Sequence, residues 1–298
     1  MNETIIETIQ RDAIISFPML GGLELNPPAY FTVFGFPIYF YGVLIVCGML
    51  LAILYCSRRA PAFGIKPDDF FPDLMLWLLP LVILGARLYY VLFRLDYFLA
   101  NPASILAIRD GGLAIYGGVI TGALVLLVFC RKRNIDVRSM LDLCVYGLLI
   151  WQIIGRWGNF MNREAFGAQT EIFCRMGLTS PDGNTIYVHP TFLYESLWNL
   201  IGLIFLIVWD RKGKRAYDGQ CVLIYLFWYG LGRAWIEGLR TDSLYIGNTG
   251  LRVSQLLSIV LCVGALITLI VQSRRRHDPR ALFVNRNLNN NEAEETGR

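Results

Sequence analysis

Residues 253–276 read VSQLLSIVLCVGALITLIVQSRRR, an uncharged, mostly apolar run that ends at three arginines. A helix that crosses a bilayer needs roughly 20 mostly apolar residues, because the hydrocarbon core is about 30 Å thick. Residues 253–272 reach that length without a charged side chain. Clustered arginines are typical of the cytoplasmic end of such a helix. The stretch therefore predicts a membrane-spanning helix that ends near the cytoplasm.

Six further runs of similar length precede it. The whole chain is 55% hydrophobic and only 17% charged, whereas soluble domains are about 45–50% apolar and about 25% charged. Backbone polar groups in hydrocarbon must be satisfied within their own segment, and the two-residue alternation of a β-barrel is absent. The sequence thus predicts an all-α integral membrane protein with seven transmembrane helices, placed at approximately 37–57, 71–93, 113–130, 139–155, 190–209, 219–237 and 253–272.

The basic residues alternate between the connecting segments. Segments 58–70, 131–138, 210–218 and the C-terminal tail hold clusters of arginine and every lysine of the chain, and the intervening segments hold few. Cytoplasmic loops carry the excess of lysine and arginine. This pattern predicts an N-terminus outside and a C-terminus in the cytoplasm.

Three regions follow from that topology. We expect an extracytoplasmic N-terminal segment at 1–36, a transmembrane domain at 37–272, and a disordered cytoplasmic tail at 273–298. Residues 1–36 lack the basic and then apolar pattern of a cleavable signal peptide. The longest connection, 156–189, contains a turn signal at 181–184 and predicts a small extracytoplasmic cap.

Several ionisable residues lie inside or beside the predicted helices, where a charge costs about 2.5–3.5 kcal/mol on insertion scales. With the topology above they fall in the outer half of the membrane: Arg87, Arg156, Glu195, Arg233, Glu237 and Arg240. Tyrosines accompany them at Tyr41, Tyr116, Tyr194 and Tyr229. Single arginines at helix ends can also snorkel to the interface, and tyrosines there can form an aromatic belt.

Arg233 and Glu237 are spaced four residues apart, which places them on one helix face where they can pair. Such a pair can be purely structural. Three arginines from three predicted helices, Arg87, Arg156 and Arg233, favour a shared anion instead, and phosphate matches the guanidinium fork. The glycines around Tyr116 permit either close helix packing or the approach of a headgroup to backbone N–H groups.

The segment 155–167 reads GRWGNFMNREAFG and resembles the signature of the phosphatidylglycerol–prolipoprotein diacylglyceryl transferase family. Further similarities run along residues 37–272 in the order of that family. They are Tyr41-Gly42, Gly85-Ala86-Arg87, Asp110-Gly111-Gly112 with Tyr116-Gly117-Gly118, His189-Pro190 with Tyr194-Glu195, and Tyr229-Gly230 with Arg233, Glu237 and Arg240.

The resemblance implies a lipid transfer in the bacterial cytoplasmic membrane, with the active site toward the extracytoplasmic side. The diacylglyceryl group of phosphatidylglycerol moves to the cysteine thiol in the lipobox of a prolipoprotein signal peptide. A thioether forms and glycerol phosphate leaves. This is the first step of bacterial lipoprotein maturation, and it implies no metal and no cofactor.

The resemblance also implies site residues. Arg233, Tyr116, Glu237 and Tyr41 are expected to be catalytic. The residues expected to bind phosphatidylglycerol are Arg156, Asn159, Asn162, Glu164, Arg87, Tyr229 and Arg240.

One position departs from the family pattern. Many members carry histidine where this chain has Tyr116, and tyrosine, with an ordinary pKa near 10, is a poor base at neutral pH. Tyr116 can instead donate a hydrogen bond to a phosphate oxygen. His189 and Glu195 are alternative bases, and the sequence leaves the choice open.

Other functions are less favoured by the sequence. A transporter or flippase for an anionic lipid shares the membrane arginines, but no internal repeat is visible. A seven-helix receptor has only the helix count in its favour. No nucleic-acid motif occurs. The seven cysteines show no metal-ligand spacing and are typical of small core residues.

Overall fold

The computed structural model describes residues 13–108, 111–241 and 252–286. It is mostly helical with two small sheets. The principal helices are α2 (Phe40–Arg59), α3 (Met75–Leu92), α4 (Leu95–Ala100), α5 (Ile115–Arg133), α6 (Val137–Asn162), α7 (Thr191–Arg211), α8 (Gln220–Leu239) and α9 (Val253–Ser273). Short helical turns lie at Pro18–Leu20, Ala60–Phe63, Asp69–Leu74, Pro102–Leu106 and Pro279–Ala281.

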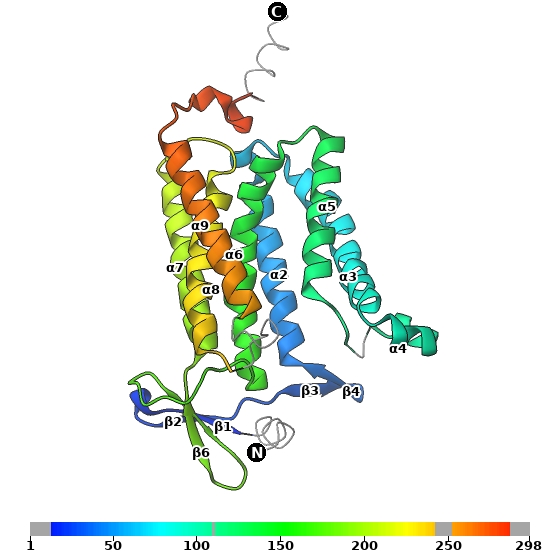
Figure 1. Cartoon of the computed structure of the whole chain (residues 1–298), viewed down its shortest axis with the longest axis vertical. Helices are drawn as coiled ribbons and strands as arrows, with labels where there is room; N and C mark the ends of the chain where they lie inside the picture. Colours follow the sequence, from blue (N-terminus) through cyan, green and yellow to red (C-terminus); the bar gives the residue numbers. More distant parts are fainter. Residues whose placement is uncertain (1–12, 109–110, 242–251, 287–298) are drawn as a thin grey trace, which may run out of the picture. The chain divides into compact units, whose positions relative to one another are not determined.

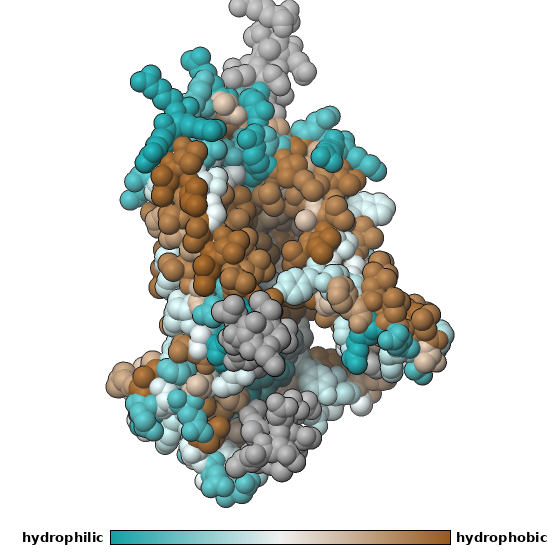
Figure 2. All heavy atoms as spheres, in the orientation of Figure 1, coloured by the Kyte–Doolittle hydropathy of each residue, from teal (hydrophilic) through white to brown (hydrophobic). Residues whose placement is uncertain are grey.

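Six helices of the described residues are long and apolar enough to span a membrane. Their bounds are Phe40–Phe63, Asp69–Leu92, Ile115–Arg133, Val137–Asn162, Thr191–Arg211 and Val253–Ser273. In Figure 2 the visible helix surfaces are hydrophobic through their middle and hydrophilic toward both ends. These features indicate a multi-pass membrane protein.

The remaining predicted span, 219–237, corresponds to α8. This helix is 20 residues long but does not meet the hydropathy of the other six. The reason lies in its composition, because Gln220, Arg233 and Glu237 interrupt the apolar run. Its polar face serves the site described below rather than lipid.

Proline, glycine and asparagine residues mark the ends of helices α2 and α5. Pro61 follows the last turn of α2, and Gly64 then takes a left-handed conformation with φ +71°. At Gly64 a Cβ atom would lie 2.7 Å from the Cα of Val284, so glycine is needed for both its backbone and its space. Asn134 ends α5 in the same left-handed region and donates its N–H to the carbonyl of Cys130.

The described residues divide into two compact units. One lies within residues 1–55 and 144–277, and the other within 56–143 and 278–298. In the first unit, Figure 1 shows α7, α8 and α9 running beside α6, with strands at one end of these helices. In the second unit, α3 and α5 pack along each other, and Gly117 permits this because a Cβ there would lie 2.5 Å from the carbonyl of Gly85.

A four-stranded antiparallel sheet forms the cap of the first unit. Its order is β2-β1-β5-β6, with the strands at Leu23–Leu25, Ile14–Phe17, Met176–Thr179 and Thr185–Val188. Ile15 pairs with both Leu25 and Leu178. A hydrophobic cluster that includes Ile15, Phe160 and Phe192 fixes the sheet on the ends of α6 and α7.

The sheets are one difference from the expected all-α chain. Part of the N-terminal segment 1–36 supplies β1 and β2, and a separate hairpin, β3 (Tyr30–Val33) with β4 (Phe36–Tyr39), leads into α2. Strand β1 is only four residues long, too short to stand out in a sequence. It pairs with the nearby strand β2 and with β5, which is distant in the chain.

Helix α6 also differs from the expectation, because it continues to Asn162 rather than ending near residue 155. Arg156 and Asn159 therefore project from its last turns rather than from a loop. The predicted span ended too early because it was bounded by hydropathy. The polar side chains after residue 155 lower the hydropathy, but they do not end the helix.

Part of the tail is folded. Within the expected disordered segment 273–298, Leu282 and Phe283 are buried, and the guanidinium of Arg286 lies 3.1 Å from the carboxylate of Asp136. Hydropathy and low complexity did not reveal this local docking. Residues 287–298 lie outside the described part of the chain.

Candidate functional site: an arginine–carboxylate cluster

The carboxylate of Glu195 on α7 is the centre of the site. It is buried, with 4% of its surface exposed. Arg156 of α6 approaches Oε2 at 2.6 Å, and Arg233 of α8 approaches Oε1 at 2.9 Å. Arg240, just after α8, lies 3.5 Å from Oε1. Three guanidinium groups from two helices and a helix end thus meet one carboxylate; we call these four residues with Glu237 the arginine–carboxylate cluster.

Glu237 completes the cluster from the next turn of α8. Its Oε2 lies 2.7 Å from Nη2 of Arg233, as an ion pair without hydrogen-bond alignment. Arg252 also donates to the backbone carbonyl of Glu237. The predicted i,i+4 pair on one face of the helix is therefore confirmed.

A reciprocal tryptophan contact holds α7 and α8 in register. The indole N–H of Trp198 donates to the carbonyl of Trp228 at 2.9 Å, and the indole N–H of Trp228 donates to the carbonyl of Trp198 at 2.8 Å. The rings stack with centroids 4.2 Å apart. Gly232 makes room for this contact, because a Cβ there would lie 2.2 Å from Nε1 of Trp198. The contact fixes Glu195 opposite Arg233.

The motif residues on α6 extend the cluster toward the cap. Nη1 of Arg156 donates to the side-chain oxygen of Asn159 at 3.3 Å, and the Asn159 amide donates to Glu164 at 2.9 Å. Tyr41 of α2 lies against Gly158, where a Cβ would approach its ring to 2.7 Å. The glycine of the motif therefore permits the tyrosine to reach this part of α6.

The guanidinium of Arg156 retains donors for a ligand. A guanidinium carries five N–H groups, and Arg156 uses Nη2 for Glu195 and Nη1 for Asn159. Its side chain is 23% exposed, against 16% for Arg233 and 11% for Arg240. Arg156 is thus the most accessible arginine of the cluster.

Two further expected residues lie beside this network. Asn162 is the last residue of α6. Tyr229 of α8 stacks on Tyr225, with ring centroids 5.5 Å apart. Their expected roles stay predictions.

The two alternative bases occupy different environments. Glu195 already accepts contacts from three arginines, so its oxygens serve as their counter-ion. His189 lies before α7, and Nδ1 is 3.4 Å from the hydroxyl of Tyr194. Burial lowers the pKa of His189, so its imidazole is neutral at pH 7.

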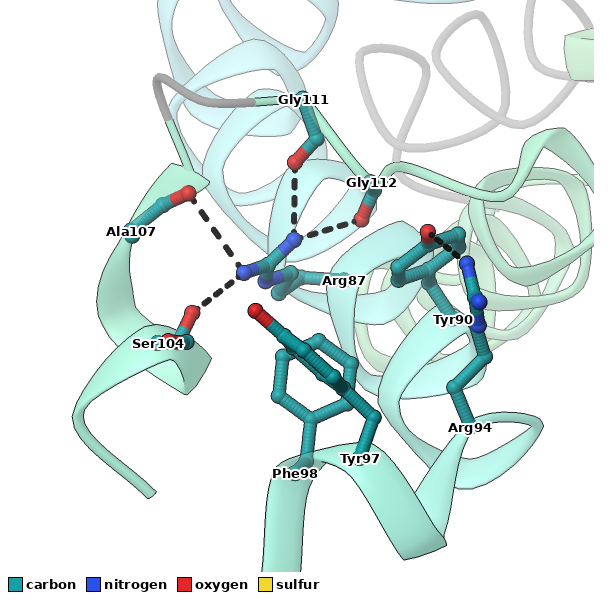
Figure 3. Close-up of a pocket in the computed structure, with 9 residues that line it drawn as sticks. All are labelled: Arg87, Tyr90, Arg94, Tyr97, Phe98, Ser104, Ala107, Gly111 and Gly112. Carbon is teal, nitrogen blue, oxygen red and sulfur yellow. Dashed lines mark hydrogen bonds between the residues drawn. The ribbon is translucent and has the colours of Figure 1, made fainter. Parts of the chain in front are cut away.

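Arg87 and Tyr116 belong to the second unit. Tyr116 lies in the first turn of α5 and is exposed. Arg87 is buried and donates to the backbone carbonyls of Ser104, Ile105, Ala107, Gly111 and Gly112 (Figure 3). All five of its N–H groups are thus engaged by the chain itself. Asp110 of the quoted similarity lies outside the described residues.

One motif residue has a structural task that sequence reasoning missed. Arg163 is buried and donates to the carbonyls of Ala13, Met161 and Pro27 and to the side chain of Asn26, each at 2.8 Å. It ties the N-terminal segment to the end of α6. Its position inside the motif was the available signal, but Ala13, Asn26 and Pro27 lie 136 to 150 residues away in sequence.

Comparison with known proteins gives consistent matches. The family model described as prolipoprotein diacylglyceryl transferase matches residues 28–271. A phosphatidylglycerol–prolipoprotein diacylglyceryl transferase of Enterococcus faecalis is 46% identical over 263 residues, which cover 86% of this chain and 93% of that protein.

Proteins of the same name give similar values in two other bacteria. The one from Limosilactobacillus reuteri is 46% identical over 85% of this chain and 92% of its own length. The one from Streptococcus pneumoniae is 47% identical over 79% of this chain and 90% of its own length. Residues 28–271, which the family model matches, contain the whole arginine–carboxylate cluster.

Proposed function

The chain belongs to the prolipoprotein diacylglyceryl transferase family, and from this we propose that its arginine–carboxylate cluster is the site of the transfer. The enzyme is a membrane transferase for prolipoprotein lipidation. Phosphatidylglycerol is the donor, and the acceptor is the lipobox cysteine of a prolipoprotein signal peptide. The observation that carries the site assignment is the convergence of Arg156, Arg233 and Arg240 on Glu195.

The chemistry needs stabilisation of a departing phosphate. The thiolate sulfur forms a bond to the glyceryl carbon, and the bond from that carbon to the phosphate oxygen breaks. The leaving oxygen keeps the electron pair, so negative charge grows on glycerol phosphate. Fixed guanidinium groups in a dry site stabilise such charge strongly, because they need no reorganisation during the reaction.

The two central arginines receive different roles in this proposal. Arg156 holds the headgroup of phosphatidylglycerol with its remaining donors, assisted by Asn159 and Asn162. Arg233 stabilises the phosphate as it leaves, with Arg240 beside it. Glu195, Glu237 and Glu164 orient the arginines and limit the build-up of positive charge.

Tyrosines complete the proposed site. Tyr41 and Tyr229 bond to headgroup oxygens. The hydrogen bond expected from Tyr116, which belongs to the second unit, to a phosphate oxygen stays a prediction. The thiol proton passes to a base before or during attack, because the thiolate is the nucleophile. His189 suits that task better than Glu195, since its imidazole is neutral while the Glu195 carboxylate is held by three arginines.

The membrane topology is part of the proposal. Seven crossings, with α8 as the sixth, keep the basic segments 58–70, 131–138, 210–218 and the C-terminal tail on the cytoplasmic side. The N-terminus and the β-sheet cap then lie outside. The cluster lies near the C-terminal end of α6 and the N-terminal end of α7, which this topology puts toward the extracytoplasmic side.

A mass measurement tests the function directly. Purified full-length chain is incubated with phosphatidylglycerol vesicles and a lipobox peptide, and the peptide is analysed by mass spectrometry. We expect a mass increase of one diacylglyceryl group on the cysteine, and no increase on a peptide with serine in its place. Lipid movement across the vesicle bilayer without any peptide modification would support a flippase and refute the transferase.

A further inference from the structure

A polar pocket lies in the second unit of the chain. It has a volume of about 250 Å³ and is formed by the end of α3, by α4, and by Ser104, Ala107, Gly111 and Gly112. Arg87, Arg94, Tyr90, Tyr97 and Phe98 provide its side chains (Figure 3). Pockets that bind drug-sized ligands have volumes of about 300–1,000 Å³. This pocket therefore suits a small polar group, such as one headgroup.

Arg87 builds the wall of this pocket but does not offer it donors. Its guanidinium bonds hold the carbonyls of Ser104, Gly111 and Gly112 at 2.6 to 2.9 Å. Its central carbon lies 5.3 Å from the ring centre of Phe98. Arg87 thus supplies a fixed positive charge and fixes the shape of the surrounding segment.

Arg94 is the residue that can grip a ligand. Figure 3 shows its guanidinium beside Tyr90, to whose hydroxyl Nη1 donates at 3.1 Å. Among the described residues this is the one hydrogen bond of its side chain, and the side chain forms no ion pair with any of them, Asp96 of α4 included. Four of its five N–H groups remain available, and they match two oxygens of a phosphate.

The rim adds acceptors for hydroxyl groups. A carbonyl oxygen has two lone pairs, so the carbonyls of Gly111 and Gly112, each engaged once by Arg87, can each accept one more bond. The carbonyl of Ser104 already accepts from both Arg87 and the N–H of Ala107. The hydroxyl of Tyr97 lies on the same side of the pocket (Figure 3). A ligand with a phosphate and hydroxyls satisfies both sets of groups. A cationic headgroup would instead be repelled by two guanidinium groups.

The surroundings place this pocket at a lipid interface. Arg94 follows the candidate span that ends at Leu92, and large apolar side chains around the pocket are exposed. They are Phe93 at 72%, Leu99 at 75% and Leu106 at 84%. Water would disfavour such exposure, whereas the boundary between headgroups and acyl chains accommodates it.

We propose that this pocket binds the headgroup of an anionic phospholipid that carries hydroxyls, with Arg94 on the phosphate and the carbonyl rim on the hydroxyls. The inference rests on the proposed function, because that function makes phosphatidylglycerol the donor lipid. It adds a donor-lipid site built from residues other than the arginine–carboxylate cluster. Such a site raises the local supply of donor without taking part in the transfer.

A binding titration tests the site independently of activity. The full-length chain in detergent is titrated with phosphatidylglycerol and, separately, with phosphatidylcholine, and bound lipids are counted by native mass spectrometry. Arg94→Gln should bind one phosphatidylglycerol fewer at saturation, or bind it about tenfold more weakly. Arg211→Gln, which removes an exposed charge at the end of α7, is the matched control and should bind like the wild type. Equal binding by Arg94→Gln and the wild type overturns the proposal.

Kinetics distinguish a lipid site from a site for free glycerol phosphate. With phosphatidylglycerol diluted in phosphatidylcholine vesicles, Arg94→Gln should raise the KM for the lipid about five- to tenfold and leave kcat unchanged. Tyr97→Phe should raise KM about twofold.

If Arg94→Gln leaves KM unchanged and only weakens inhibition by added glycerol phosphate, the pocket binds the product and the lipid proposal is wrong. A lower kcat at unchanged KM overturns it as well. Absence of transfer by the wild type would instead refute the proposed function, while the binding titration still judges this site.

Discussion

Glu195 organises three arginines, and this single buried carboxylate explains why charged residues are tolerated so close to membrane helices. A buried ion pair that loses one partner costs about 3–5 kcal/mol, because the remaining charge stays uncompensated. Arg156 and Arg233 therefore depend on Glu195 for their placement. Their remaining donors then face a ligand without further ordering of the side chains.

Replacement of Arg156 tests the headgroup role. Arg156→Ala should lower kcat/KM by about 10²–10³-fold, because loss of one partner of a buried charge-assisted contact to the headgroup phosphate costs about 2–5 kcal/mol. Arg156→Lys should also be impaired, because an ammonium lacks the planar fork. The measurement is peptide lipidation at equal protein amounts, with thermal unfolding to verify the fold. Wild-type turnover in Arg156→Ala would refute its role.

At the scale of helices, the α7–α8 contact depends on a glycine. Gly232→Ala would place a Cβ against the indole of Trp198, and such overpacking costs about 1–3 kcal/mol. Because this contact sets Glu195 opposite Arg233, we expect a lower melting temperature together with at least a tenfold loss of transfer activity. The control is Gly264→Ala on α9, where a Cβ meets no atom within 4 Å. Full activity in Gly232→Ala would contradict the role of this contact.

The start of α6 offers a pH-dependent test. Asp136 accepts hydrogen bonds from the backbone N–H groups of Arg138 and Ser139, as a helix cap does. Burial tends to raise its pKa, but bonds from Arg138 and Arg286 outweigh this and hold the pKa of Asp136 below its usual range. A carboxyl with a depressed pKa stabilises the fold above its unfolded pKa, and that contribution disappears as pH falls through the folded pKa.

Two substitutions separate the cap from the charge. Asp136→Ala should lower stability by about 1 kcal/mol through loss of the cap, and further through loss of the ion pairs. Asp136→Asn keeps the cap and loses only the charge. Thermal unfolding should therefore rank wild type, Asn and Ala at pH 7. The wild type and Asp136→Asn should converge as the pH falls below about 4. A difference that is constant with pH would exclude the carboxylate's role.

For the whole molecule, the proposed orientation is directly testable. Asp182 lies in the exposed turn of the cap and Lys212 in the exposed segment after α7. In intact cells, a membrane-impermeant maleimide should label Asp182→Cys, whereas Lys212→Cys should be labelled only after permeabilisation. Labelling is read as the gain over the unsubstituted chain, since seven native cysteines are present. The reverse pattern would invert the topology and move the cluster to the cytoplasmic side.

Four features could be predicted from the amino-acid sequence: the membrane class, the positions of the long helices, the Arg233–Glu237 pair and the family. These features depend on local hydropathy, on side chains one turn apart, or on a contiguous motif such as residues 155–167. Each can be recognised without knowing what lies across the fold.

The partner of each charged side chain became known only from the folded chain. The sequence analysis grouped Arg87 with Arg156 and Arg233 around one anion. In the structure Arg87 donates to backbone carbonyls, whereas Arg156 and Arg233 form ion pairs with Glu195. The strand at Ile14–Phe17 likewise exists through its pairing with Met176–Thr179. The physical reason is that ion pairs and strand pairs are satisfied through space, and a sequence displays the donors without showing the acceptors they reach.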